Sequence, residues 1–524
     1  MPRNITIKPI IILLILLPVF TGISRAQNYC SSYGNTSYQT SITLVNFNTI
    51  SNSSAKPSGY SDYTSITTEV TKGISYNLTV NLNTDGNYRV WARVWIDWNG
   101  NGSFNDSGES YDLGNARNTT NGPTSLSPLA INVPAGAVTG TTRMRVSAKY
   151  NSYPAPCETN FDGEVEDYTL NVAPPSISFY SQGSDPAQLS NWNTVRTGGG
   201  SSPASFTASN QTFVIQATHS MTAATAWSVS GTGTKVQIES AASLTANAAV
   251  SLSSSTTFQI DNGGVYNQNH NINNNIFSGT SSFAAGSTVN YMLSGAQTVA
   301  SVVYGNLTLS GSGAKTLTGA TVNGVLSMEG TVTASGTAPS FGSAASLQYK
   351  GSSAQATGIE FPASFAGTGG VIVNNAAGVT LSGSKTIGSQ LTLTGGALSI
   401  GSYTLTLSNG SVLSYGAGSL TGGTSSDLTI GTGADITLSA VSGGLNNLST
   451  SRNITLGASL DVGGTLTLTA GNFTVGANTL TLNGPAIAGT PTNLITSSAS
   501  SLSFGGTSAG VNIPGSVTSL NNLT

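Results

Sequence analysis

Charged side chains are scarce in this chain: Asp, Glu, Lys and Arg make up only 7% of its 524 residues, against about a quarter in an average soluble domain. The 17 basic and 20 acidic residues give a net charge of −3. A protein that binds nucleic acid needs a basic surface to neutralise phosphates, and this composition supplies none. We therefore exclude nucleic acid as a partner.

Groups that usually carry catalysis are also scarce. The two histidines, His219 and His270, lie among Ser, Thr and Asn without a Cys or an acidic cluster beside them, which matches neither a metal site nor a catalytic triad. The acids of residues 176–524 are few and widely separated: Asp185, Glu239, Asp261, Glu329, Glu360, Asp427, Asp435 and Asp461. A β-helical polysaccharide lyase or hydrolase would group its carboxylates. We expect no enzymatic activity.

Only one long hydrophobic run is present, at residues 10–20, preceded by Arg3 and Lys8 and followed by a small residue at Ala26. This order is typical of a secretory signal peptide, and we predict one at residues 1–26. The run spans about eleven residues, whereas a membrane-spanning helix needs roughly 20. The mature chain is therefore expected to lack a transmembrane segment and to be secreted, extracellular or attached to the cell surface.

Cysteine is nearly absent, with Cys30 and Cys157 as the two examples. An exported chain reaches a compartment in which disulfides persist, so we predict that the two cysteines pair. Two free thiols are the less favoured alternative in an exported protein.

The composition changes at residues 173–175. Residues 1–175 hold 11 basic and 12 acidic side chains, and the remaining 349 residues hold six and eight among abundant Gly, Ser, Thr, Asn and Ala. We predict a first domain at 27–172, a linker at 173–178 and a repeat region at 179–524. Short alternating segments at 41–45, 76–80, 90–96, 143–146 and 165–172 predict strands. The first domain is thus expected to be an antiparallel β-sandwich.

The second region repeats itself. The segment 391–407 (LTLTGGALSIGSYTLTL) returns at 466–482 (LTLTAGNFTVGANTLTL), an offset of 75 residues, and this long repeat is clear from about residue 379. Within it, apolar residues recur every seven positions, at Leu391, Leu398, Leu405 and Val412 and again at Leu466, Phe473, Leu480 and Ile487.

Each apolar position lies in an alternation of the Leu-Thr-Leu type followed by Gly, Asn or Ser turns, which is typical of strands. Three such units make one turn of a parallel β-helix, or β-solenoid, of roughly 16 turns. A row of small β-sandwiches is the alternative. Because the last copy is shorter than the preceding one, we expect a longer parent protein.

A polar loop follows the strand at 90–96. It places oxygen ligands at alternating positions with Gly102 at the sixth: Asp97, Asn99, Asn101, Asp106 and Glu109. Calcium loops use such spacing, so we predict a Ca²⁺ site here. The alternative is a hairpin loop in which Asn and Asp side chains bond to their own backbone.

The densest acidic cluster contains Glu164, Glu166 and Asp167. Catalytic carboxylates would need separated environments. Arg143 and Arg145 share one face of a nearby predicted strand and are expected to pair with these acids. We predict a structural role for the cluster.

Several motifs occur in a fixed order: Tyr29-Cys30, VWIDWN at 94–99, TRMRV at 142–146, Cys157 and GEVEDY at 163–168. In this respect residues 28–172 resemble the GEVED domain, an accessory module of large secreted proteins from Bacteroidetes-type bacteria. The resemblance implies an exported, multidomain protein. The repeats resemble stalk regions of adhesin-like surface proteins.

These features predict an all-β, non-enzymatic structural or adhesive surface protein, with an extracellular glycan or a surface protein as its partner. The alternative is a carbohydrate-binding module on a stalk, because aromatic rings on a sandwich can stack on sugars. Candidate rings are Tyr60, Tyr63, Trp91, Trp95, Trp98, Tyr111 and Tyr168.

Overall fold

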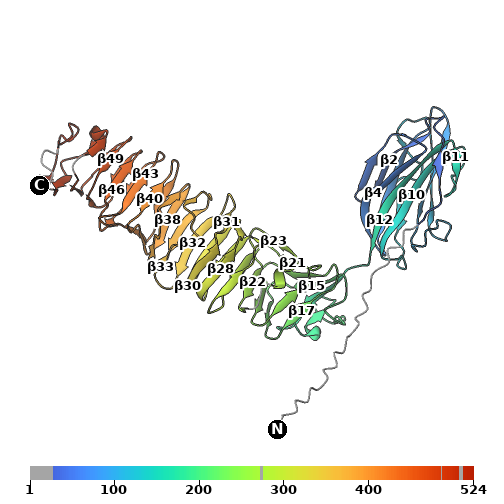
Figure 1. Cartoon of the computed structure of the whole chain (residues 1–524), viewed down its shortest axis with the longest axis horizontal. Coiled ribbons are helices and arrows are strands. Elements are labelled where there is room, and N and C mark those ends of the chain that lie inside the picture. The colour runs from blue at the N-terminus through green and yellow to red at the C-terminus, as the bar shows by residue number, and fades with distance from the viewer. Residues whose placement is uncertain (1–27, 272–274, 485–486, 507–511) are drawn as a thin grey trace, which may run out of the picture. The chain divides into compact units, whose positions relative to one another are not determined.

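The computed structural model describes residues 28–271, 275–484, 487–506 and 512–524. The predicted signal peptide at residues 1–26 lies outside these ranges. The chain forms two compact units, one ending at Pro175 and the other spanning Ser176–Thr524 (Figure 1). In the described ranges both units are built from strands, and the second also has three-residue 3₁₀ helices at Leu189–Asn191, Asn275–Phe277 and Pro491–Asn493. Within the described residues, no helix is long and apolar enough to cross a membrane.

The first unit is a sandwich of two five-stranded sheets. One has the order β4 (Tyr60–Thr71), β12 (Gly163–Ala173), β10 (Gly140–Tyr150), β6 (Arg89–Ile96) and β7 (Ser110–Arg117). The other has the order β3 (Ile50–Ser53), β2 (Ser41–Phe47), β5 (Ser75–Asn83) and β8 (Gly122–Pro123), with β9 (Leu129–Asn132) also on β5. Alternate residues of both sheets, such as Val80 and Val94, form one buried core, as expected for facing sheets.

One strand pair departs from the predicted antiparallel arrangement. β4 runs parallel to β12, with Tyr60 opposite Val165. The chain leaves the second sheet after β3 and enters the first as β4. No hairpin therefore links β4 to β12, and hairpins are what make neighbouring strands antiparallel. The sandwich is otherwise antiparallel, apart from the short parallel pair β1 (Tyr33–Gly34) and β11 (Thr159–Phe161).

The second unit is a parallel β-solenoid of about 14 turns from about residue 212 to 523, fewer than the expected 16. Its three largest sheets run along the stack (Figure 1). The first contains β14 (Trp192–Asn193), β13 (Ile177–Ser181), β15 (Gln211–Ile215), β18 (Lys235–Ile238), β21 (Thr257–Ile260) and β23 (Thr280–Phe283). The second has the main path β16 (Ser220–Ala223), β19 (Ser243–Ala246), β22 (Val265–Gln268), β24 (Thr288–Tyr291), β27 (Asn306–Leu309), β30 (Val325–Thr337), β32 (Ser346–Gly351), β35 (Gly370–Asn374), β38 (Gln390–Gly395) and β41 (Val412–Tyr415). The third contains β34 (Ser364–Phe365), β37 (Lys385–Ile387), β40 (Thr404–Leu407), β43 (Asp427–Ile430), β46 (Asn447–Thr450), β49 (Leu466–Leu468) and β52 (Ile487–Gly489).

Successive turns align identical positions. Phe213 pairs with Val236 and Val236 with Phe258, as their sequence spacing predicts. In β40, Leu405 and Leu407 are buried while Thr404 and Thr406 are partly exposed, because side chains alternate between the two faces of a strand. This parallel stacking excludes the row of small sandwiches.

The seven-residue spacing slips at one position. Leu391 pairs with Leu413, and the predicted core residue Val412 is 48% exposed. The turn loop before β41 is one residue longer than the repeat implies, so the neighbouring leucine takes the inward position.

The 75-residue repeat does not equal a whole number of turns. Leu391 lies in β38 of the second large sheet, whereas its repeat equivalent Leu466 lies in β49 of the third. Turn length also varies, since the stacked residues Leu405, Leu428, Leu448 and Leu466 are 23, 20 and 18 positions apart. Equivalent copies therefore occupy different faces of the solenoid. The repeat preserves the alternation of strands and turns. This alternation can form any of the sheets of the solenoid, because each sheet needs the same inward and outward side chains.

Aromatic residues cover the first turns of the solenoid. Trp192 packs against Phe213 and Trp227, with ring centroids 5.2 and 5.7 Å apart, and Phe206 contacts the same two rings. Trp192 comes from β14, which pairs antiparallel with β13. This segment closes one end of the core, as stacked repeats require.

Candidate functional site

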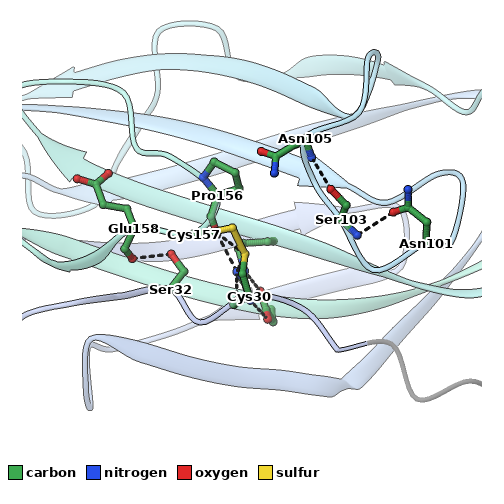
Figure 2. The surroundings of a disulfide bond; sticks show 10 residues. Cys30, Ser32, Asn101, Ser103, Asn105, Pro156, Cys157 and Glu158 are labelled. Carbon is green, nitrogen blue, oxygen red and sulfur yellow. Dashed lines mark hydrogen bonds and ion pairs between the residues drawn. A yellow bond between two sulfur atoms is a disulfide. The ribbon is translucent and has the colours of Figure 1, made fainter.

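A disulfide joins the start of the sandwich to its last loop. Cys30 and Cys157 are bonded, with their Cα atoms 5.4 Å apart (Figure 2), which confirms the predicted pairing. Beside the bond, Ser32 Oγ donates a hydrogen bond to the carbonyl of Glu158 at 2.9 Å, and β1 pairs with β11. The N-terminal segment is thereby held across the outer face of the β10–β12 sheet.

The acidic motif lies on β12 and divides between the two faces of that strand. Glu164, Glu166 and Asp167 are all fully buried. Glu164 and Glu166 share a face with Tyr168, whose ring belongs to the sandwich core, whereas Asp167 points to the opposite face. One short motif thus supplies two different polar clusters.

On the outer face, Asp167 forms a two-pronged ion pair with Arg145. Arg145 Nε lies 2.7 Å from Asp167 Oδ1, and Arg145 Nη2 lies 2.8 Å from Oδ2. Arg145 Nη1 donates to the carbonyls of Cys30 and Pro156, both at 2.8 Å. Each guanidinium nitrogen therefore has a partner in a buried position, where geometry of this quality is needed to offset desolvation.

Two aromatic rings cover these arginines. Phe104 lies 5.0 Å from the Arg145 guanidinium, and Tyr29 lies 4.7 Å from that of Arg143, within the range of cation–π attraction. The two rings stack at 4.9 Å. Arg143 also reaches Asp167 Oδ2 at 3.1 Å. Sequence spacing gave no sign that Phe104 would close this site.

The predicted pairing of Arg143 and Arg145 with the acidic motif thus holds for Asp167. On the inner face, neither glutamate has an arginine partner among the described residues. Glu164 accepts hydrogen bonds from the Ile42 N–H at 3.0 Å and from Ser61 Oγ at 3.1 Å. Glu166 Oε2 accepts one from the Tyr168 hydroxyl at 2.6 Å. Strand alternation explains the difference, because Arg143 and Arg145 project from the other face of the sheet.

Burial changes how these glutamates titrate. It raises the pKa of Glu164 to about 8, helped by the negative charge of Glu166, and it raises the pKa of Glu166 to about 7. Within the described residues, Glu166 Oε1 is buried without a hydrogen-bond partner. Both carboxyls are thus held in their neutral form at a pH where free glutamate is ionised.

Residues 91–171 match the family model of the GEVED domain. This segment is a GEVED domain. No curated protein and no solved structure matches the chain. The matched segment runs from β6 to β12, and β2–β5 complete the same two sheets, while β1 pairs with β11. We refer to residues 28–173 as the GEVED sandwich.

The loop at 97–109 of the GEVED sandwich closes on its own backbone. Asp97 Oδ1 accepts from the Asn101 N–H at 3.1 Å, and Asp97 Oδ2 accepts from the Gly102 N–H at 2.8 Å. Further side-chain to backbone bonds link Asn101, Ser103 and Asn105 (Figure 2). These contacts are those of the hairpin-loop alternative.

The other predicted calcium ligands also lie in this loop. Asn101 Nδ2 donates to Asp106 Oδ2 at 2.9 Å, and Glu109 Oε1 accepts from the Asn99 N–H at 3.1 Å. Burial raises the pKa of Glu109, and its Oε2 is buried without a hydrogen-bond partner in the described ranges. No group of three or more His, Cys, Asp or Glu among the described residues is placed to hold a metal ion. The Ca²⁺ site stays a prediction.

Most of the rings predicted to stack on sugars serve the fold instead. Trp95, Trp98 and Tyr168 are at most 4% exposed. Tyr60 donates to Asp167 Oδ2 at 3.1 Å, and Tyr111 accepts from Trp98 Nε1 at 2.8 Å. Tyr63 packs on Tyr168, and Trp91 packs on Tyr153. The most exposed aromatic residues of the GEVED sandwich are different ones, Tyr33, Tyr38, Tyr88 and Tyr150.

Proposed function

We propose that this protein is exported to the cell surface and acts there as a non-enzymatic structural or adhesive protein, with the GEVED sandwich as its contact module and the solenoid as its stalk. The observation that carries this proposal is the joining of a GEVED domain to about 14 stacked turns. A stack in which each turn contacts its neighbours gains length with every repeat. The disulfide fits an oxidising, extracellular compartment.

The few charged residues of the solenoid support a stalk role, because several are used inside it. Lys315 is fully buried, and its Nζ donates to the carbonyls of Leu293 and Gly295 at 2.7 and 3.0 Å. Arg452 donates to the carbonyls of Ser411 and Thr432, both at 2.7 Å. These cations bond to backbone groups of neighbouring turns and thereby stabilise the stack.

Surface display is tested on intact cells that produce the protein. Protease treatment should release fragments of the GEVED sandwich, and mass spectrometry of the mature chain should find its first residue at Gln27. Recovery of the protein only from the cytoplasm, with residues 1–26 retained, would overturn the proposal.

Adhesion is tested separately with beads that carry the full chain. These beads should bind to host or bacterial surfaces, and beads that carry a chain lacking residues 28–173 should not.

A further inference from the structure

A cleft lies at one end of the GEVED sandwich, and its lining does not include Arg143, Arg145 or Asp167. Its volume is about 340 Å³, within the size range of small-molecule sites. The lining residues lie at the end of β10 or in loops next to strand ends: Tyr38, Thr40, Asp85, Tyr88, Tyr150 and Asp162. Loops at the end of a rigid sandwich are common places for binding residues.

Three tyrosines of this cleft expose their rings to solvent. Tyr38, Tyr88 and Tyr150 are 51%, 53% and 39% exposed. Tyr88 and Tyr150 meet edge to face, with their centroids 5.5 Å apart, which holds one ring against the other. Exposed aromatic residues gathered at one place mark a binding surface more often than scattered ones do.

Two carboxylates lie among these rings. Asp85 Oδ2 accepts a hydrogen bond from the Gln39 N–H at 3.1 Å. The Asp162 carbonyl accepts one from the Tyr150 N–H at 2.9 Å, which places Asp162 beside that ring. In the part of the chain that the structure describes, Asp162 Oδ1 is buried without a hydrogen-bond partner. A buried acceptor without a donor is costly. Because Asp162 lines the cleft, a turn of its carboxylate toward a ligand hydroxyl would give this oxygen a donor.

The charges around the cleft favour a neutral ligand. Among the described residues, the lining contains two acids and no cation, so an anion would be repelled. Lys56 lies behind the rim, where its Nζ donates to the carbonyls of Tyr38 and Thr40 at 2.9 and 2.8 Å. Its charge attracts both Asp85 and Asp162. A cationic ligand would therefore compete with a counter-ion that is already in place.

We propose that this cleft binds a neutral saccharide. The exposed rings of Tyr38, Tyr88 and Tyr150 stack on the C–H faces of the sugar, and its hydroxyls donate to Asp85 and Asp162. This inference rests on the proposed function, because it names the class of ligand that the GEVED sandwich would bind as a contact module. Binding of a saccharide to the cleft can nevertheless be measured whether or not the protein is displayed at the cell surface. The rings predicted from the sequence take no part in it.

The test uses the folded full chain on an array of neutral oligosaccharides, including gluco-, manno-, xylo- and N-acetylglucosamine oligomers, with pentalysine as a cationic probe. Hits are measured by titration calorimetry. At least one neutral oligosaccharide should bind. Tyr88→Ala should weaken it about tenfold, a loss comparable with one aromatic contact. Asp162→Asn, which keeps the shape but removes the charge, should also weaken it.

Tyr33→Ala is the matched control, because Tyr33 is 43% exposed on the same sandwich but does not line the cleft. It should leave the affinity unchanged, and all variants should keep the melting temperature of the parent chain. The proposal is overturned if no neutral oligosaccharide binds, if only pentalysine binds, or if the Tyr88 and Asp162 variants bind as the parent does. None of these outcomes would contradict surface display of the protein. Conversely, finding the protein in the cytoplasm would not contradict saccharide binding in the cleft.

Discussion

The buried glutamates make the stability of the GEVED sandwich depend on pH in an unusual direction. In the unfolded chain, Glu164 and Glu166 titrate near 4.5, whereas in the folded chain their pKa values are about 8 and about 7. Between pH 5 and pH 7 the folded state therefore holds more protons than the unfolded state. The free energy of unfolding must fall as the pH rises through this window.

The expected magnitude follows from proton counting. Each group that is neutral when folded and ionised when unfolded contributes a slope of about 1.4 kcal/mol per pH unit. For the two groups together, the loss from pH 5 to pH 7 is on the order of 5 kcal/mol, a large part of the stability of a typical domain. Glu109, whose pKa burial also raises, adds a smaller slope of the same sign.

The assay is guanidinium unfolding of the full chain at several pH values between 5 and 7. The transition of the GEVED sandwich is recognised because reduction of the Cys30–Cys157 disulfide shifts it. Removing both ionisable groups with Glu164→Gln and Glu166→Gln should flatten most of the pH slope. Glu69→Gln, which alters an exposed glutamate of β4, should keep the full slope.

Two results would refute this reasoning. One is a sandwich that becomes more stable from pH 5 to pH 7. The other is a double variant with the same slope as the parent chain, since the protons would then be bound elsewhere.

Four further changes test other parts of the structure. Asp167→Asn leaves the Arg145 guanidinium buried without its carboxylate and should lower the unfolding free energy by about 3–5 kcal/mol in guanidinium titrations; a loss below about 1 kcal/mol would contradict the buried pair. Cys30→Ser opens a loop with a sequence separation of 127 residues and should cost about 5 kcal/mol, measured as a lower melting temperature of the sandwich. Calcium should raise that melting temperature in the parent chain but not in Asp97→Asn, and no response to EDTA in the parent chain would remove the predicted site. Leu448→Ala, in the fully buried core of the solenoid, should cost about 2–5 kcal/mol in the solenoid transition alone in calorimetry.

The fold was largely predictable because burial leaves a local pattern. The alternation in segments such as Leu405-Thr406-Leu407 marks one inward and one outward face, and it suffices to predict both the strand and its stacking. The pattern was less informative where a turn changes length. Val412 fits the seven-residue spacing, yet Leu413 takes the inward position, because loop length depends on contacts between turns.

The candidate site was less predictable because its contacts are long-range. The motif located the acids correctly, but the partners of Glu164 come from Ile42 and Ser61, about a hundred residues earlier in the chain. Tyr38 and Tyr88 likewise stand in ordinary loop sequence. Only the meeting of several loop ends at one end of the sandwich brings them together, and no local spacing reports that.

The stacking of the solenoid has a mechanical consequence. Hydrogen bonds between turns lie along the direction in which the turns are stacked, so a pull along that direction loads them in series and breaks them one turn at a time. A turn such as the one between Val236 and Phe258 contains 22 residues. It occupies about 5 Å of the stack when folded and about 75 Å when drawn out. Under tension the solenoid would lengthen in discrete steps, each dissipating the energy of one turn while the remaining turns stay intact.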